Sequence, residues 1–227
     1  LGHKKDMNFS LDYTAEQQEF QKQVDAWLND NFPRDLKLPS DFANLSHEQY
    51  QKLRELGRKL GEKGWLAPAF PKEYGGGGLS PEHGIVIGDS LNKHGVSLPP
   101  YYDPGHFTVA PAILAWGTDE QKYRFLPPIL RGEVTTWQLF TEPEDGSDLA
   151  GVQTVAIRSG KYFTINGQKA FVGGSYKAEQ FWLLARTDPK GERRKNLGMF
   201  VVPSDAAGIT IHTLDLIATG VEAGTSA

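Results

Sequence analysis

The stretch Trp137–Gly151, WQLFTEPEDGSDLAG, gathers more chemically capable side chains than any other part of the chain. It places hydroxyls at Thr141 and Ser147, with Gly146 directly before the second. Its acids are Glu142, Glu144, Asp145 and Asp148. A polar loop that leaves a strand-like run offers free amides and short hydroxyls, which can hold a ligand's carbonyls and phosphates. The alternative is a solvated turn, because most loops only connect elements.

The glycine run and the histidines are weaker candidates for chemistry than the polar loop. The glycine run at residues 75–78 lacks the lysine and the hydroxyl that complete a phosphate-binding loop, so a flexible connector is expected. The histidines show no metal-ligand spacing, and no metal is expected. They are His3, His47, His83, His94, His106 and His212. The absence of cysteine excludes disulfides, thiolate zinc sites and a cysteine nucleophile, and it favours a reducing compartment.

The composition is that of an ordinary soluble protein of one or two domains. The chain has 227 residues, 39% hydrophobic and 23% charged, with a formal net charge of -4, which argues against a surface that coats nucleic acid. The apolar runs are far too short to span a membrane and no signal peptide is evident, so a cytoplasmic protein is expected. Leu1–Asp6 and Val221–Ala227 follow no periodic pattern and are left out of the fold prediction.

The first half of the chain, which must help to position the polar loop, is expected to be helical. An N-cap signal precedes each of its apolar stripes. Capping boxes are predicted at Thr14–Gln17, Ser46–Gln49 and Thr118–Gln121. Ser80–Pro81 pairs a good N-cap with proline at the first helical position, and predicts a further helix. Pro127–Pro128 is expected to stop the last helix.

After Val134 the sequence changes to short β-branched and aromatic runs separated by turn residues. Asn166–Gly167 between two such runs predicts a tight hairpin. Strands at this spacing without intervening helices favour an antiparallel barrel or sandwich. The fold class predicted is α+β: an N-terminal all-helical domain over residues 7–133, followed by an antiparallel β-barrel-like middle domain over residues 134–220.

Five segments in register resemble the acyl-CoA dehydrogenase family. Three belong to its middle domain: TEPEDGSDLAG at 141–151, INGQKAFVGG at 165–174 and FWLLARTDP at 181–189. Two upstream segments are similar to its N-terminal helical domain: GWLAPAFPKEYGGGGLS at 64–80 and GTDEQKYRFLPPILRGE at 117–133. The similarity extends from about residue 10 to 217.

The resemblance implies an FAD cofactor in a groove of the β-domain and an acyl-CoA substrate beside it. The residues that it places along the flavin are Gln138, Leu139, Phe140, Thr141, Gly146, Ser147, Phe171, Val172 and Gly173. It places Ser147 and Thr187 against the acyl-CoA. The chain departs from the family at two of these positions. Phe171 replaces the usual tryptophan and can pack on the ring or in the core, whereas Gly173 lacks the usual hydroxyl near the reactive nitrogen, which leaves redox tuning open.

The implied reaction is α,β-dehydrogenation of an acyl-CoA thioester. A base removes the α-proton while the β-carbon delivers hydride to the flavin. In the family the base is a glutamate of a C-terminal helical domain. No residue of this chain aligns with it, so no catalytic residue is named and a C-terminally truncated, inactive fragment is expected.

The expected partners are an electron-transferring flavoprotein and, for the full-length protein, further subunits in a homo- or hetero-oligomer. The implied role is in fatty acid metabolism by β-oxidation. Two alternatives stay open: a flavin monooxygenase or oxidase on the same scaffold, and a non-catalytic partner subunit of a heteromeric acyl-CoA dehydrogenase.

Overall fold

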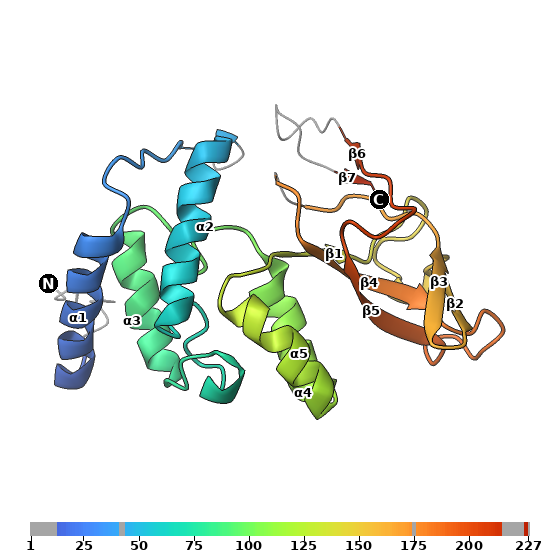
Figure 1. Cartoon of the computed structure of the whole chain (residues 1–227), viewed down its shortest axis with the longest axis horizontal. Coiled ribbons are helices and arrows are strands. Elements are labelled where there is room, and N and C mark those ends of the chain that lie inside the picture. Colours follow the sequence, from blue (N-terminus) through green and yellow to red (C-terminus); the bar gives the residue numbers. More distant parts are fainter. Residues whose placement is uncertain (1–12, 41–43, 174–175, 215–224, 227) are drawn as a thin grey trace, which may run out of the picture.

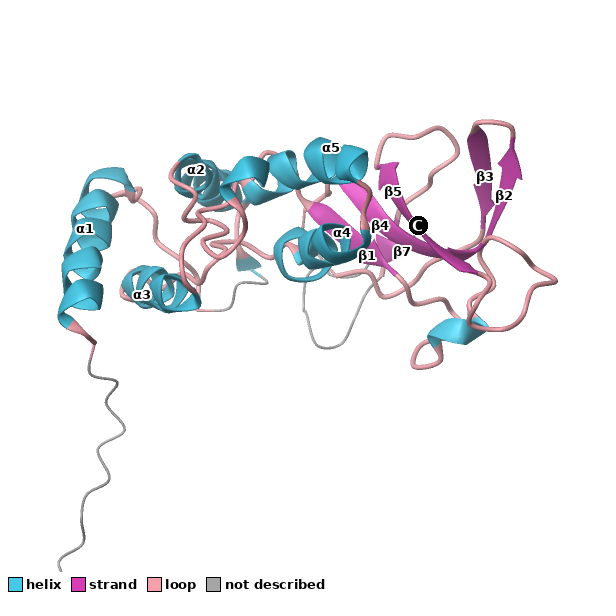
Figure 2. Ribbon diagram, turned by 90° about the horizontal axis from the view of Figure 1, so that it is seen from below, coloured by secondary structure: helices cyan, strands magenta, loops and turns pink. Residues whose placement is uncertain are grey.

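The helices and the strands form two halves of the molecule. A computed structural model of the chain describes residues 13–40, 44–173, 176–214 and 225–226 (Figure 1). The termini of the expected domains, at residues 7 and 220, lie outside these ranges. In both ribbon views α4 and α5 lie between the other helices and the sheet (Figures 1 and 2). The α-helices are α1 Ala15–Asn31, α2 His47–Glu62, α3 Pro81–Asn92, α4 Ala110–Trp116 and α5 Asp119–Leu130.

The predicted capping boxes at the starts of α1, α2 and α5 are confirmed. At Thr14, Ser46 and Thr118 the side-chain oxygen accepts from the amide three residues later, and the glutamine there returns the bond. Helix α3 begins at Pro81, as the Ser80–Pro81 pair predicts. A short 3-10 turn, η2 Lys72–Tyr74, precedes the glycine run, and a π-helical turn, η3 Gly105–Val109, leads into α4.

The prediction that Pro127–Pro128 stops the last helix is wrong, because α5 continues to Leu130 with both prolines inside it. Each proline removes its own amide donor, yet Arg131 N–H still donates to the Pro127 carbonyl at 3.0 Å. The final turn is also anchored by Ile129 and Leu130, which are fully buried. Burial of this apolar turn therefore outweighs the lost hydrogen bonds.

Three apolar clusters hold the molecule together. The first packs α1, α2 and α3 through Val24, Leu28, Leu53, Leu56, Leu60, Ile87 and Leu91. The second joins α4 and α5 to the sheet, because Trp182 of the sheet lies among Val109, Leu126, Ile129 and Leu130. The third lies within the sheet, around Trp137, Leu139, Phe181 and Leu183. The middle cluster gives the two halves a shared core.

The main sheet has five strands in the order β1-β4-β2-β3, with β5 on the other side of β4. The strands are β1 Thr136–Leu139, β2 Val155–Ser159, β3 Tyr162–Asn166, β4 Gln180–Arg186 and β5 Leu197–Pro203. A short 3-10 turn, η4 Leu149–Gly151, precedes β2. A separate pair is formed by β6 His212–Thr213 and β7 Thr225–Ser226. Strand β4 is buried along most of its length and is the centre of the sheet.

The α+β class is confirmed, but the sheet of the described residues is mixed and open rather than an antiparallel barrel. β2 with β3 and β4 with β5 are antiparallel, as predicted. β1 runs parallel to β4, and β2 meets β4 in parallel at Val155 and Arg186. Parallel neighbours need a long crossover, and residues 140–179 supply one between β1 and β4 without a covering helix.

The hairpin expected at Asn166–Gly167 is wrong, because the turn lies six residues earlier. Ser159 pairs with Tyr162, so Gly160 and Lys161 form the two-residue loop. Gly160 has φ +60 and stands at the first central position, where the turns that match strand twist favour glycine. Asn166 instead ends β3, and the chain continues toward the end of β1.

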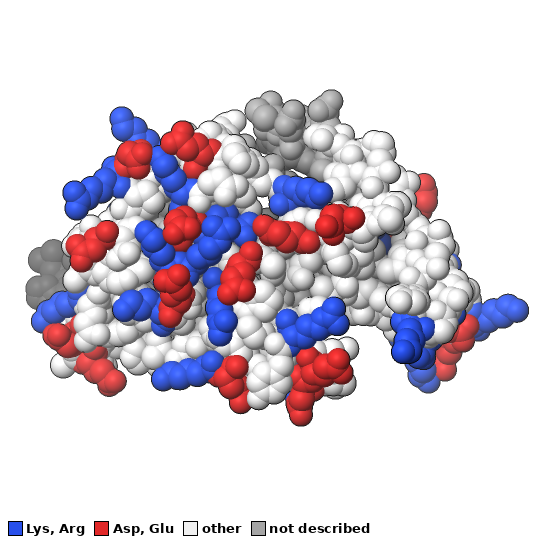
Figure 3. Space-filling model, viewed as in Figure 1, with Lys and Arg blue, Asp and Glu red and all other residues white. Residues whose placement is uncertain are grey.

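Polar contacts reinforce the junction between the two halves. The buried carboxylate of Asp103 accepts from the amides of Gly105, at 2.8 Å, and of Thr136 in β1, at 2.9 Å. The guanidinium of Arg54 in α2 reaches Glu179, which precedes β4. On the surface, charges of both signs intermingle over the helical half, as Figure 3 shows.

Candidate functional site

The polar loop lies where β4 changes its neighbour from β1 to β2. Strand β1 pairs with β4 up to Leu139 and Leu183, and β2 takes over at Arg186, whose amide donates to the Thr154 carbonyl at 2.8 Å. The loop 140–154 spans this change of partner. Within it, the turn at residues 142–145 is closed by two bonds between Glu142 and Asp145, each donating its amide to the other's carbonyl.

Glu142 ties the two ends of this loop together. Its buried carboxylate accepts from the amide of Thr154 at 2.8 Å, from the Thr154 hydroxyl, and from the amide of Gln153. It also pairs with the ammonium of Lys169 at 2.9 Å, and both side chains are almost fully buried. A carboxylate whose acceptor positions are occupied in this way suits a structural role rather than that of a base.

Burial and hydrogen bonds act in opposite directions on this pair. Burial alone would raise the pKa of Glu142, but the bonds from Thr154, Lys169 and the Gln153 amide outweigh it and lower that pKa. Burial lowers the pKa of Lys169, and Glu142 opposes that change. The carboxylate is therefore held in its charged form beside the ammonium.

Lys169 brings the second predicted flavin-lining segment against the first. Its ammonium also donates to the carbonyl of Phe140 at 3.2 Å, and the next amide, of Ala170, donates to the carbonyl of Thr141 at 2.9 Å. Residues 140–141 and 171–173 thus lie side by side, as the resemblance implies. The sequence analysis gave Lys169 no role, and its only signal is a lysine between Gln168 and the apolar residues 170–172.

An exposed aromatic surface adjoins this contact. Phe171 is 62% exposed and has φ +55, a left-handed conformation that is rare for aromatic residues. Tyr102 and Phe107 are also exposed, with ring centroids 6.1 Å apart. A Cβ at Gly173 would lie 3.6 Å from the Tyr102 hydroxyl, at ordinary contact distance. Gly173 therefore lies beside the Tyr102 ring and places no side chain of its own there.

The remaining predicted residues lie around this centre in different settings. Gln138 is half-buried in β1, opposite Trp182 of β4, and Leu139 is buried. The side chain of Phe140 packs into the cluster between the helices and the sheet. Val172 is buried in the core of the sheet. Gly146 and Ser147 are exposed on the loop.

Thr187 lies at the end of β4, in the turn that leads to β5. Its amide donates to the Asn196 carbonyl at 2.8 Å, its hydroxyl donates to the same carbonyl at 3.3 Å, and the residue is exposed. The turn and the polar loop are joined by an ion pair between Arg193 and Asp148, the residue after Ser147. The two predicted substrate contacts thus belong to connected loops.

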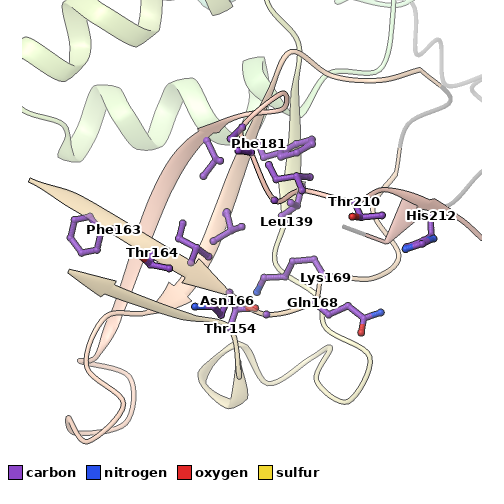
Figure 4. Close-up of a pocket in the computed structure, with 18 residues that line it drawn as sticks. Leu139, Thr154, Phe163, Thr164, Asn166, Gln168, Lys169, Phe181, Thr210 and His212 are labelled. Atoms are coloured by element: carbon purple, nitrogen blue, oxygen red, sulfur yellow. The ribbon is translucent and has the colours of Figure 1, made fainter. Parts of the chain in front are cut away.

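Two hollows adjoin the sheet, and the predicted residues do not share either. One, of about 710 Å³, has Leu139, Phe181 and Leu183 at its apolar wall and Lys169 beside it, with Thr210 and His212 across from them (Figure 4). The other, of about 680 Å³, lies between α4, α5 and β5 and includes Thr187. Leu139 and Thr187 are the predicted residues that line them, one in each.

Of the predicted flavin residues, Thr141, Phe171 and Gly173 therefore lie at an open surface whose features fit a planar, partly apolar cofactor. Phe171 offers an exposed ring, Gly173 lies beside the exposed Tyr102 ring, and the amide of Thr141 has no acceptor among the described residues. Within those same ranges no group of three His, Asp or Glu side chains could hold a metal ion. None of the described helices has the length and apolar character needed to cross a membrane.

The fold of this helical half docked on a mixed sheet is similar to that of solved acyl-CoA dehydrogenases. Family models match the acyl-CoA dehydrogenase N-terminal domain at residues 14–133 and its middle domain at residues 138–223. The chain belongs to the acyl-CoA dehydrogenase family.

Individual relatives agree with this assignment. The chain is 32% identical over 199 residues to acyl-CoA dehydrogenase FadE29 of Mycobacterium tuberculosis, which covers 87% of this chain and 49% of that protein. Its fold matches the Tcur3481-Tcur3483 steroid ACAD with TM-score 0.73 and 32% identity, over 96% of this chain and 55% of that one. It matches the ChsE4-ChsE5 complex from Mycobacterium tuberculosis with TM-score 0.75 and 31% identity, over 96% and 54%. The chain thus spans about half the length of these proteins.

Proposed function

We propose that this chain forms the FAD-binding part, and one wall of the substrate site, of an enzyme that dehydrogenates an acyl-CoA thioester between its α- and β-carbons. The proposal divides the chain into a helical domain at 7–133 and a middle domain at 134–220. It assigns no catalytic base to this chain, and it places the protein in the cytoplasm.

The observation that carries the proposal is the contact between residues 140–141 and residues 169–173. In the proposed complex the Thr141 amide donates to the polar edge of the flavin, and Phe171 packs against a ring face. The other residues proposed to hold FAD are Gln138, Leu139, Phe140, Gly146, Ser147, Val172 and Gly173. FAD, when bound, supplies a hydride acceptor for the substrate's β-carbon.

The loops that carry Ser147 and Thr187 are proposed to hold the CoA portion of the substrate. The turn after Thr187 is rich in cationic residues, and the phosphates of CoA are anionic. Those cations are Lys190, Arg193, Arg194 and Lys195. The exposed hydroxyl of Ser147 can donate to carbonyl or phosphate oxygens. The hydroxyl of Thr187 donates to the Asn196 carbonyl, so toward CoA it offers its lone pairs to amide donors.

A spectroscopic experiment tests the proposal. The protein, expressed in its full reading frame, is expected to purify yellow, with flavin absorbance near one FAD per chain. Anaerobic addition of a suitable acyl-CoA should bleach that absorbance, and an electron-transferring flavoprotein should restore it. Failure to bleach with straight, branched, aromatic and polycyclic acyl-CoA thioesters would contradict the proposal. Turnover coupled to oxygen consumption would favour a monooxygenase or oxidase instead.

A second candidate is a subunit of a heteromeric acyl-CoA dehydrogenase. It is favoured by the similarity to the ChsE4-ChsE5 complex and to the Tcur3481-Tcur3483 protein. The expected result is activity that appears only when a distinct second chain is added. Full activity of a purified homo-oligomer would argue against it.

A further inference from the structure

The buried ammonium of Lys169 joins three segments that meet beside the proposed flavin site. It pairs with Glu142 of the polar loop at 2.9 Å and donates to the carbonyl of Phe140 at 3.2 Å. Glu142 in turn accepts from the amides of Gln153 and Thr154 at the start of β2. Lys169 itself directly precedes the 170–173 segment.

The bond from Lys169 to Phe140 fixes the orientation of one peptide group. In a trans peptide the carbonyl of residue 140 and the amide of residue 141 point in opposite directions. The Phe140 carbonyl points to Lys169, so the Thr141 amide points to the opposite side of the chain. No acceptor within the described residues takes the hydrogen of that amide. The ammonium and the free amide thus lie on the two sides of one peptide plane.

A buried ion pair is a costly way to hold a fold together. Apolar residues of similar volume often serve stability equally well, because two charges must be taken out of water. An apolar side chain cannot, however, donate to the Phe140 carbonyl. That donation needs an ammonium, and an ammonium this deeply buried needs a carboxylate beside it. Orientation of the peptide therefore explains the pair better than stability does.

We infer that Lys169, held in place by Glu142, is a positioning residue that directs the Thr141 amide toward the bound cofactor. This inference rests on the proposed function, because the ligand of the amide is taken to be FAD. Neither Lys169 nor Glu142 touches the reacting atoms. Their effect is transmitted through the Phe140–Thr141 peptide.

Paired substitutions separate positioning from stability. Lys169→Met leaves the Glu142 charge buried without its partner, so it should lower both the urea midpoint and the affinity for FAD. The double variant Lys169→Met/Glu142→Gln removes both charges. It should recover most of the urea midpoint. The dissociation constant for FAD, measured by flavin fluorescence, should stay at least about tenfold above wild type, because the Thr141 amide no longer points its hydrogen bond at the cofactor. The matched control is Lys22→Met/Glu19→Gln, the same change at an exposed pair of α1, which should alter neither quantity.

Each outcome of this experiment is decisive. A double variant that regains wild-type FAD affinity together with its stability would overturn the positioning role and leave a purely structural pair. A double variant that stays as unstable as Lys169→Met would also overturn it, because the pair would then serve the fold. If wild-type full-length protein binds no FAD, the proposed function itself fails. That outcome is distinguishable from the other two because it appears in the wild type, before any variant is compared with it.

Discussion

The guanidinium of Arg54, in the middle of α2, lies 3.2 Å from the carboxylate of Glu179, the residue before β4. Arg54 is 3% exposed and its remaining contacts are the Glu133 carbonyl, the Tyr50 hydroxyl and the face of the Tyr101 ring. Glu179 also accepts from the amide and the hydroxyl of Thr135, directly before β1. One ion pair thus connects the helical half to the starts of both parallel strands.

Replacing Glu179 with glutamine should destabilise the protein by about 1–2 kcal/mol, since it leaves a buried guanidinium without a counter-charge while the carboxylate side is partly solvated. The measurement is the free energy of unfolding in urea. Glu192→Gln is the control, because its partner Lys195 is exposed, and it should change stability by less than about 0.5 kcal/mol. Equal effects of the two substitutions would show that the Arg54 contact is dispensable.

Gly61 of α2 is expected to tolerate no side chain. A Cβ there would lie 2.4 Å from the carbonyl oxygen of Arg131, so Gly61→Ala must push apart α2 and the end of α5, at a cost of about 2 kcal/mol or more. Among the described residues, no atom outside the adjoining backbone of α3 and the two chain neighbours lies within 4 Å of the Cβ position of Gly88. Gly88→Ala should therefore stabilise the protein by about 0.5–1 kcal/mol through helix propensity. Thermal unfolding of the two variants should move in opposite directions, and a loss of stability in both would refute the close approach.

Phe171 is expected to lower the stability of the fold through its strained backbone and to strengthen FAD binding through its exposed ring. Its left-handed backbone is strained, and its ring is largely exposed, so Phe171→Gly should leave the free energy of unfolding unchanged or raise it by up to about 1 kcal/mol. The same change should weaken FAD binding about tenfold or more, because the ring face is lost. Arg194→Gly is the control, since Arg194 also has a positive φ, of +75, in an exposed turn. It should relieve strain without changing FAD affinity, and unaltered FAD binding by Phe171→Gly would remove Phe171 from the site.

Stability should fall on acidification because hydrogen bonds hold the carboxylates of Glu142 and Glu179 in their charged forms. Both pKa values lie below the ordinary 4.5, since bonds from Thr154 and Lys169, and from Thr135 and Arg54, outweigh the effect of burial. A depressed folded-state pKa contributes stability above the ordinary value, and that contribution is lost as pH falls through the folded value. The urea midpoint should therefore be level above about pH 5 and decline below about pH 4.5.

Glu142→Gln should make that decline shallower, because one of the two groups that bind a proton is gone. Glu144→Gln, at an exposed acid of the same loop, should leave the decline as it is in wild type. The measurement is the urea midpoint between pH 3.5 and pH 7, and identical acid profiles for the two variants would contradict the assignment to Glu142.

Much of the helical half could be predicted because its signals are local. Capping boxes at Thr14, Ser46 and Thr118 depend on residues three apart, so they hold whatever the chain packs against. The stop at Pro127–Pro128 was wrong because burial of Leu130 is a tertiary effect. The β half was less predictable for the same reason. Both Gly160 and Gly167 follow residues that suit a turn, and the choice between them depends on strand register, which distant partners fix.

The sequence predicted the segments of the candidate site but not the buried ion pair that holds them together. The resemblance pointed to residues 138–141 and 171–173, which the structure brings side by side. It gave no role to Lys169, and a lysine that follows Asn166, Gly167 and Gln168 is expected at a surface rather than 1% exposed. Its burial depends on Glu142, which lies 27 residues earlier in the chain. A pairing of that kind follows from the crossover between β1 and β4, which composition and periodicity do not reveal.

The crossover also bears on the order in which the sheet assembles. The β2–β3 hairpin closes over a two-residue turn and can form on its own, whereas β1 has no partner until β4 arrives, after residues 140–179 have been ordered or looped out. Closing so long a loop costs entropy before any pairing repays it. Docking of β4 should therefore be the late, rate-limiting event in folding, and the helices, with their local contacts, should be in place to receive it.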